Sequence, residues 1–196
     1  NPCVVVDLQL GEGDDDGRFV VDDFQDGLGD AGSSSSGEAV ALSVTGWVED
    51  RLDDPNTNFT HNASQPMNGM SYCRSNDTER GAVFEFDSAD AEVVWDVAEA
   101  ARNARAWDHL SLRVCQGTRH PLTTAELADL HFDVTLTDHM GRSSSMSIET
   151  FGGGVEEPYQ RTSCGTGAGW ANEFETISLR LEEFEAAGSD FDLGNL

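Results

Sequence analysis

The stretch HFDVTLTDHMGRSSSMSIETF, residues 131–151, indicates the fold class most directly. Apolar residues alternate with polar ones from Phe132 to Leu136, and after a turn that contains a glycine the alternation resumes from Met146 to Ile148. Successive side chains of a strand point to opposite faces of its sheet. The pattern therefore predicts a β-hairpin with one face in a core and the other toward solvent or a ligand.

The same alternation recurs along the whole chain, while helical patterns are few. Together with the hairpin it predicts about nine strands, which is typical of an antiparallel sandwich or barrel. A long polar loop is expected over residues 49–80. Short helical segments are expected at Val97–Ala106, at Thr123–Asp129 and at Leu181–Ala187. The other predicted strands cover residues 4–10, 19–24, 40–45, 82–87, 92–97, 110–115 and 177–181.

The charge of the chain is strongly negative. It has 37 acidic and 11 basic residues, a formal net charge of −26. Such a surface repels phosphate backbones and anionic lipids, so nucleic acid and membranes are not expected partners. It attracts divalent cations instead. The chain also has no apolar run long enough to cross a bilayer.

The four cysteines are widely spaced, without a CxxC pair. An even number of distant cysteines in a strand-rich chain predicts disulfides, and hence an extracellular, secreted protein. We expect Cys73 to pair with Cys115, and Cys3 with Cys164 because the terminal segments of a sandwich commonly meet. Other connectivities remain open, and buried thiols in a cytosolic protein are the alternative.

The acidic run EGDDDGRFVVDD, residues 12–23, is the strongest candidate for a metal site. Laid on a calcium-binding loop, Glu12, Asp14 and Asp16 take the first three ligand positions and Asp23 the last one, with a glycine at the tight turn. Alternating carboxylates suit the six to eight oxygen ligands of Ca²⁺. The simpler interpretation is an acidic turn between two strands.

Signatures of catalysis do not occur. The chain has neither GxSxG nor HExxH, its five histidines lack metal-ligand spacing, and its glycine-rich runs lack the lysine of a phosphate-binding loop. Acidic residues are too abundant for spacing to single out an acid–base pair. We therefore expect a protein that is not an enzyme.

The layout resembles the galactose-binding-like β-jelly-roll domains, which include many non-catalytic carbohydrate-binding modules of secreted proteins. The resemblance covers residues 18–196 and lies in four segments: VVDDF (20–24), WDHLSLRV (107–114), DLHFDVTLTDHMGRS (129–143) and FETISLRLEEFEAAGSDFDLGNL (174–196). It implies an antiparallel β-sandwich of jelly-roll type, with its last strand beyond the end of this sequence. It also implies a structural Ca²⁺ beside the first strand, near the DDF segment.

A ligand site is expected on the outer face of one sheet, which the resemblance implies is concave and able to hold a saccharide. Alternation places Arg113, Asp133, Thr135 and Glu149 on one face if their strands are neighbours, with Ser145 and Ser147 beside them. Tyr159 or Trp170 would add an aromatic ring from a rim loop. The alternative is a polar face that simply meets water.

The sequence thus predicts one domain over residues 1–196, with an N-terminal strand and acidic loop at 1–17 and a jelly-roll core at 18–196. The expected function is that of a non-catalytic accessory module of a secreted protein, which binds a polysaccharide or other glycan and packs against other domains of a parent protein. The alternative function is a structural, inter-domain packing module with no small-molecule ligand.

Overall fold

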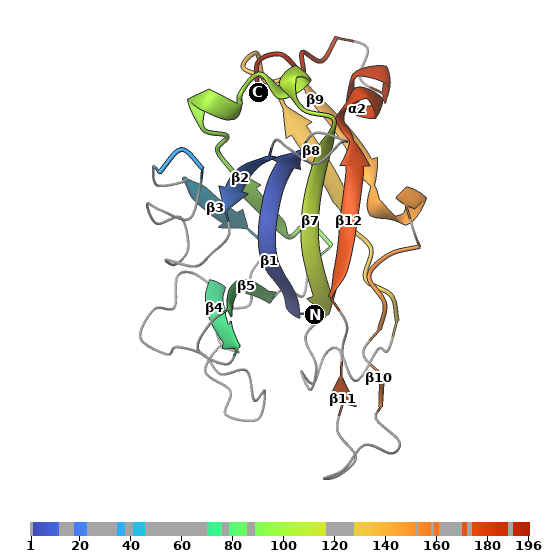
Figure 1. Cartoon of the computed structure of the whole chain (residues 1–196). Helices are drawn as coiled ribbons and strands as arrows, with labels where there is room; N and C mark the ends of the chain where they lie inside the picture. The colour runs from blue at the N-terminus through green and yellow to red at the C-terminus, as the bar shows by residue number, and fades with distance from the viewer. Residues whose placement is uncertain are drawn as a thin grey trace.

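The computed structural model is an all-β structure, mostly strands in antiparallel sheets, with one α-helix among the residues described (Figure 1). The structure describes residues 2–11, 18–22, 35–37, 41–45, 70–75, 79–85, 89–116, 128–151, 153–157, 159–160, 170–171, 174–187 and 190–196.

The strands follow the alternating segments of the sequence. Their bounds are β1 Pro2–Gly11, β2 Arg18–Asp22, β3 Leu42–Thr45, β4 Met70–Ser75, β5 Glu79–Glu85, β6 Glu92–Trp95, β7 His109–Gln116, β8 Asp133–Thr137, β9 Ser143–Ser147, β10 Tyr159–Gln160, β11 Trp170–Ala171 and β12 Glu175–Arg180. The helical segments are the 3-10 helices η2 Glu99–Ala101, η3 Ala104–Ala106 and η4 Ile148–Phe151, and the α-helix α2 Leu181–Ala187.

The largest sheet has six strands in the order β12-β7-β1-β5-β4, with β2 also paired to β1. The N-terminal strand β1 is central in it. One edge of β1 pairs with β7, and the other pairs with β5 at its start and β2 at its end. Residues 2–11 therefore belong to the middle of the sheet and are no appendage to it. The remaining pairs, β3–β6, β8–β9 and β10–β11, are two-stranded sheets.

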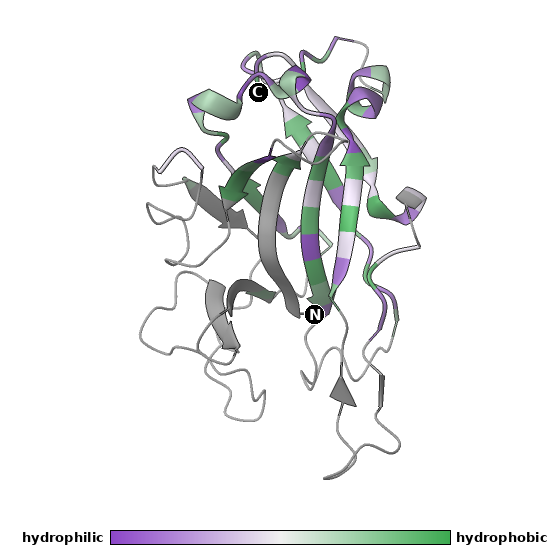
Figure 2. Cartoon of the chain, in the orientation of Figure 1, coloured by the Kyte–Doolittle hydropathy of each residue, from purple (hydrophilic) through white to green (hydrophobic). Residues whose placement is uncertain are grey.

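The core lies between the six-stranded sheet and the strands that cover it. Along β7, Leu110, Leu112 and Val114 are buried on one side, while Arg113 on the other side is exposed. Figure 2 shows this alternation of hydrophobic and hydrophilic residues along β7 and β12. Val134 of β8 packs against the buried cluster that includes Leu112 and Val114 of β7, as do Val93 and Trp95 of β6. Burial of this apolar surface is the main force that holds the two layers together.

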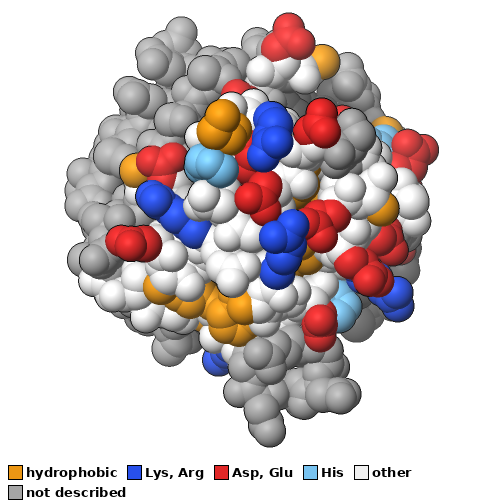
Figure 3. All heavy atoms as spheres, turned by 90° about the horizontal axis from the view of Figure 1, so that it is seen from above, with side chains coloured by type: hydrophobic (Ala, Val, Ile, Leu, Met, Phe, Trp, Pro, Cys, Tyr) orange, Lys and Arg blue, Asp and Glu red, His pale blue; other side chains and the backbone are white. Residues whose placement is uncertain are grey.

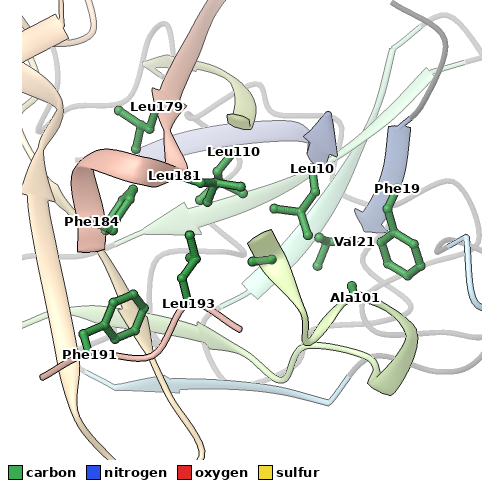
Figure 4. Packing of buried hydrophobic residues seen from close by; sticks show 11 residues of the cluster. Leu10, Phe19, Val21, Ala101, Leu110, Leu179, Leu181, Phe184, Phe191 and Leu193 are labelled. Atoms are coloured by element: carbon green, nitrogen blue, oxygen red, sulfur yellow. The ribbon is translucent and has the colours of Figure 1, made fainter. Parts of the chain in front are cut away.

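A second part of the core closes one end of the molecule. Leu181 and Phe184 lie one turn apart on α2 and are buried together with Phe191 and Leu193 of the C-terminal segment (Figure 4). They pack on Leu110 of β7 and on other members of the same cluster, which include Leu10, Phe19, Val21 and Leu179. The final residues therefore contribute to the core.

The structure corrects the predicted elements at three places. Residues 70–75, assigned to a polar loop, form β4, and they pair with β5 over six residues. The segment Val97–Ala106 forms the two short 3-10 helices η2 and η3 in place of one helix. Ile148 and Glu149 belong to η4 and do not continue the hairpin. The predicted helical segment Leu181–Ala187 is confirmed as α2.

Candidate functional site

The outward side of β7 and β12 carries an ordered set of polar side chains, which we call the β7–β12 face. The strands pair in register as His109 with Arg180, Ser111 with Ser178, and Arg113 with Thr176. Directly paired side chains of neighbouring strands share one face of the sheet. The hydroxyl groups of the middle pair are linked by a hydrogen bond of 3.2 Å. The β7–β12 face is thus a hydroxyl pair with an arginine beyond each end.

An exposed aromatic ring adjoins this face where β12 begins. The guanidinium carbon of Arg113 lies 5.3 Å from the centre of the Phe174 ring, and Phe174 is 40% exposed. A cation over an aromatic face is attracted by the ring's quadrupole. This contact restrains the guanidinium and occupies none of its N–H donors. A ring, a set of donors and a pair of hydroxyls therefore lie side by side.

The row of residues at the other end of the β7–β12 face extends across four strands. Gly11 of β1 pairs with His109 on one side and with Arg18 of β2 on the other, and Arg180 completes the row beyond His109. A Cβ atom built on Gly11 would have no heavy-atom neighbour within 4 Å. The row therefore offers two arginines and a histidine around an open position.

The β8–β9 hairpin presents a different polar surface. Asp133 pairs with Ser147, Thr135 with Ser145, and Thr137 with Ser143. The hydroxyls of the last two pairs are only 2.7 Å and 2.8 Å apart, so they hydrogen-bond to each other across the strands. This ladder uses part of their hydrogen-bonding capacity on the protein itself.

The structure does not bring Arg113 together with Asp133, Thr135 and Glu149, because the condition for a common face, neighbouring strands, is not met. β7 belongs to the six-stranded sheet and the hairpin to a separate sheet. The inward side chains of both sheets, Val114 and Val134 among them, meet in one core. Their outward side chains consequently point away from each other, and Glu149 lies exposed in η4.

Tyr159 and Trp170, which were predicted to supply an aromatic ring to the ligand site, lie on the short paired strands β10 and β11. The structure pairs Tyr159 of β10 with Ala171 of β11, and Gln160 with Trp170. Figure 1 places this pair of strands at the end of the molecule where β12 begins. Arg113 belongs to the same end, because it pairs with Thr176 near the start of β12 and lies over the Phe174 ring. Trp95 and Trp107 pack against the two core clusters.

A buried carboxylate organises the opposite end of the molecule. Asp138 in the β8–β9 turn accepts hydrogen bonds from the backbone amides of Met140 at 2.9 Å, Arg142 at 3.0 Å and Asp192 at 3.1 Å. The Arg142 guanidinium also donates to it, with Nε at 2.7 Å and an ion-pair contact at 2.7 Å. Burial by itself raises the pKa of a carboxyl group, but these donors outweigh it and hold the pKa of Asp138 well below its usual range.

A second ion pair joins the same end to η3. Arg105 bonds to Glu185 of α2, and its Nη1 lies 3.2 Å from Oδ1 of Asp192. The hydrogen bond that the Arg105 guanidinium donates to the Glu185 carboxylate raises the pKa of Arg105. Figure 3 shows this end from above, where acidic, basic and histidine side chains are interspersed. Asp138 holds the C-terminal segment through the Asp192 amide, and Arg105 does so through the Asp192 carboxylate, which gives this end a structural role.

The proposed calcium ligands Glu12, Asp14, Asp16 and Asp23 lie outside the described residues. Residues 18–22 of the same run form β2, which pairs antiparallel with β1. The run is therefore no continuous twelve-residue loop, and residues 12–17 connect two paired strands. Among the residues that the structure does describe, no three His, Cys, Asp or Glu side chains form a group able to hold a metal ion.

The sheet order contradicts the predicted Cys73–Cys115 disulfide. Cys73 lies on β4 and Cys115 on β7, with β5 and β1 between them. Three strand spacings amount to about 14 Å, whereas a disulfide requires Cα atoms within about 7 Å. Cys3 stands on β1 and Cys164 lies outside the described residues, so their pairing stays a prediction.

Comparison with known proteins finds no relatives: no family model, curated protein or solved structure matches the chain. No helix in the described part of the chain is both long and apolar enough to span a membrane.

Sequence reasoning identified Arg113 but missed its neighbours on the β7–β12 face. The alternation in 177–181 did indicate that Ser178 and Arg180 share a side of their strand. Which strand lies beside them, and at what offset, depends on pairing between segments about 67 residues apart, as for Ser111 and Ser178. Phe174 was not predicted as a site residue because it lies just before β12, outside the alternating segment.

Proposed function

We propose that this chain is a non-catalytic module of jelly-roll type in a secreted protein, and that it binds carbohydrate through the β7–β12 face. The observation that carries the proposal is the Arg113 guanidinium over the exposed Phe174 ring, next to the hydroxyls of Ser111 and Ser178. Sugar sites combine an apolar ring surface with hydrogen-bond donors and acceptors. All three are present on β7, on β12 and at Phe174, the residue just before β12.

The rigidity of the strands supports this location. β7 is paired along both edges, with β1 and β12, and its inward side is buried in the core. Sites built on paired strands hold their side chains more accurately than sites on loops. The hydroxyls of the β8–β9 hairpin are paired with each other, as those of Ser111 and Ser178 are, and what distinguishes the β7–β12 face is the Arg113 guanidinium over the exposed Phe174 ring. We therefore place the site on the β7–β12 face in preference to the hairpin.

The test is binding to an array of neutral and acidic polysaccharides. Phe174→Ala should lower the affinity for the bound glycan by about tenfold, because loss of a buried aromatic contact costs on the order of 1–2 kcal/mol. Thr135→Ala is the matched control on the hairpin and should leave the affinity unchanged.

Two other outcomes would change the proposal. Equal affinity of the Phe174→Ala variant and the parent would remove the β7–β12 face as the site. Failure of the folded protein to bind any glycan on the array would favour the alternative function, a module that packs against other domains and holds no small ligand.

A further inference from the structure

We infer that the ligand of the β7–β12 face is an acidic polysaccharide, whose carboxylate or sulfate groups contact the arginines at the two ends of the face. The inference rests on the proposed carbohydrate function and specifies its ligand class. It follows from the charge of this face compared with the rest of the chain.

The six residues of the β7–β12 face include two arginines and a histidine and no acidic residue. The chain as a whole has 37 acidic and 11 basic residues, so such a face is unusual for it. The acidic residue within β12, Glu175, pairs with Val114 on the inward side, and its Oε1 accepts a hydrogen bond from the amide of Glu156 at 2.6 Å. The nearest acidic position in register is Asp7 of β1, opposite Arg113.

The spacing of the arginines suits an extended ligand. Arg113 and His109 are four residues apart on β7, which corresponds to about 14 Å along the strand. Arg180 pairs with His109, and the row continues through the open position at Gly11 to Arg18. A sugar chain lying along the strands would meet the Ser111–Ser178 hydroxyls between two cationic ends. Guanidinium groups bind carboxylate and sulfate oxygens with charge-assisted, often bidentate hydrogen bonds.

Among the side chains that the structure describes, none forms a strong ion pair with either of the two end arginines. Arg113 contacts the Phe174 ring, and Arg180 lies 3.5 Å from Glu182, with both of those side chains more than half exposed. Exposed pairs of this kind contribute little, so an anionic ligand would displace the contact at small cost. The net charge of −26 repels polyanions at long range, but salt at physiological strength screens charges beyond about 8 Å and leaves direct contacts.

The experiment is isothermal titration calorimetry of the whole chain at physiological salt with four probes: polygalacturonate, dextran sulfate, uncharged dextran and duplex DNA. Each titration is run with millimolar Ca²⁺ and with chelator, because residues 12–17, which connect β1 to β2 in the sequence, include four acidic residues. We expect binding of one or both acidic polysaccharides, and the two of them distinguish carboxylate from sulfate recognition.

Arg113→Gln should weaken that binding by about tenfold, as expected for loss of one charge-assisted contact. Arg102→Gln is the matched control, since it removes the same charge from an exposed position outside the face, and it should change affinity less than twofold.

Binding of uncharged dextran that Arg113→Gln does not affect would overturn the inference and leave the carbohydrate function standing. Equal binding of DNA, or equal loss in both variants, would overturn it in favour of simple charge attraction. No binding to any polysaccharide here or on the array would overturn both proposals.

Discussion

The carboxylate of Asp138 accepts a hydrogen bond of 3.1 Å from the backbone amide of Asp192, 54 residues further along the chain. The bond joins the β8–β9 turn to the C-terminal segment. A backbone bond from His139 to Asn195 reinforces this junction, and another from Ala104 to Leu193 joins the same C-terminal segment to η3. The end of the molecule is thus held by one buried charge and by backbone pairing.

Asp138→Asn should lower the melting temperature by several degrees. The variant keeps the shape of the side chain but replaces a carboxylate that accepts bonds from Arg142 and three backbone amides with a neutral group that has one acceptor oxygen. Thermal unfolding followed by circular dichroism measures the effect. Thr135→Ala is the control, because its hydroxyl pair is exposed, and its shift should be much smaller; equal shifts would show that Asp138 has no special role.

The stabilisation by Asp138 should depend on pH. Its folded-state pKa is held below its ordinary value, and in the unfolded chain an aspartate titrates near about 3.9. The contribution is therefore complete above that unfolded pKa and is lost as the pH falls toward the folded pKa. We expect the difference in melting temperature between the parent and Asp138→Asn to be constant from pH 7 to about 5 and to shrink below about 4. A difference that grows in acid would contradict this assignment.

Two phenylalanines provide a matched test of the core. Phe184 is fully buried, at 0% exposure, in the cluster that includes Leu181 and Leu193, whereas Phe174 is 40% exposed. Phe184→Ala should reduce the free energy of unfolding by about 3–5 kcal/mol, and Phe174→Ala by about 1 kcal/mol or less. Urea denaturation measures both. Similar losses in the two variants would mean that α2 does not pack as described.

Substitutions at the adjacent glycines Gly153 and Gly154 distinguish the cost of backbone strain from the cost of steric contact. Both have positive φ, 92° and 107°. A Cβ atom on Gly154 would lie 2.8 Å from the His131 ring and 2.9 Å from the Leu130 carbonyl oxygen, whereas one on Gly153 would meet nothing within 4 Å. Gly153→Ala should cost about 1 kcal/mol of unfolding free energy through strain, and Gly154→Ala at least about 1 kcal/mol more through overpacking. Equal costs in urea denaturation would argue against the close approach of His131.

Calcium should stabilise the chain if the acidic connection between β1 and β2 binds it. A ligand that binds only the folded state at a hundredfold excess over Kd adds about 2.7 kcal/mol, which corresponds to roughly 5–10 °C for a chain of this size. Melting in millimolar Ca²⁺ and in excess chelator measures this, with Mg²⁺ as the control for general charge screening. Identical melting in all three conditions would leave residues 12–17 as an acidic turn.

The alternation of apolar and polar residues was sufficient to predict the antiparallel β-class and most of the longer strands, among them β1, β7 and β12. It was sufficient because the two-residue period of a strand is a local property, which appears in the sequence of any strand that has one buried face. β4 was missed because Met70–Ser75 lacks a clear alternation of apolar and polar residues. The helical segment at Leu181–Ala187 was found because its glycine stop follows directly.

The site depended on relationships that no local pattern contains. Arg113 could be placed on the outward side of its strand from the sequence, but its partners Thr176 and Phe174 follow from the pairing of β7 with β12. Likewise the sequence places Asp138 in a turn, but only the tertiary structure shows that its carboxylate binds the backbone amide of Asp192. Strand order and register are set by the packing of side chains far apart in the chain, because a sheet buries its apolar face only in the arrangement that fits all of its layers at once. That is why the faces of β7 and of the β8–β9 hairpin, alike in sequence pattern, point to opposite sides of the molecule.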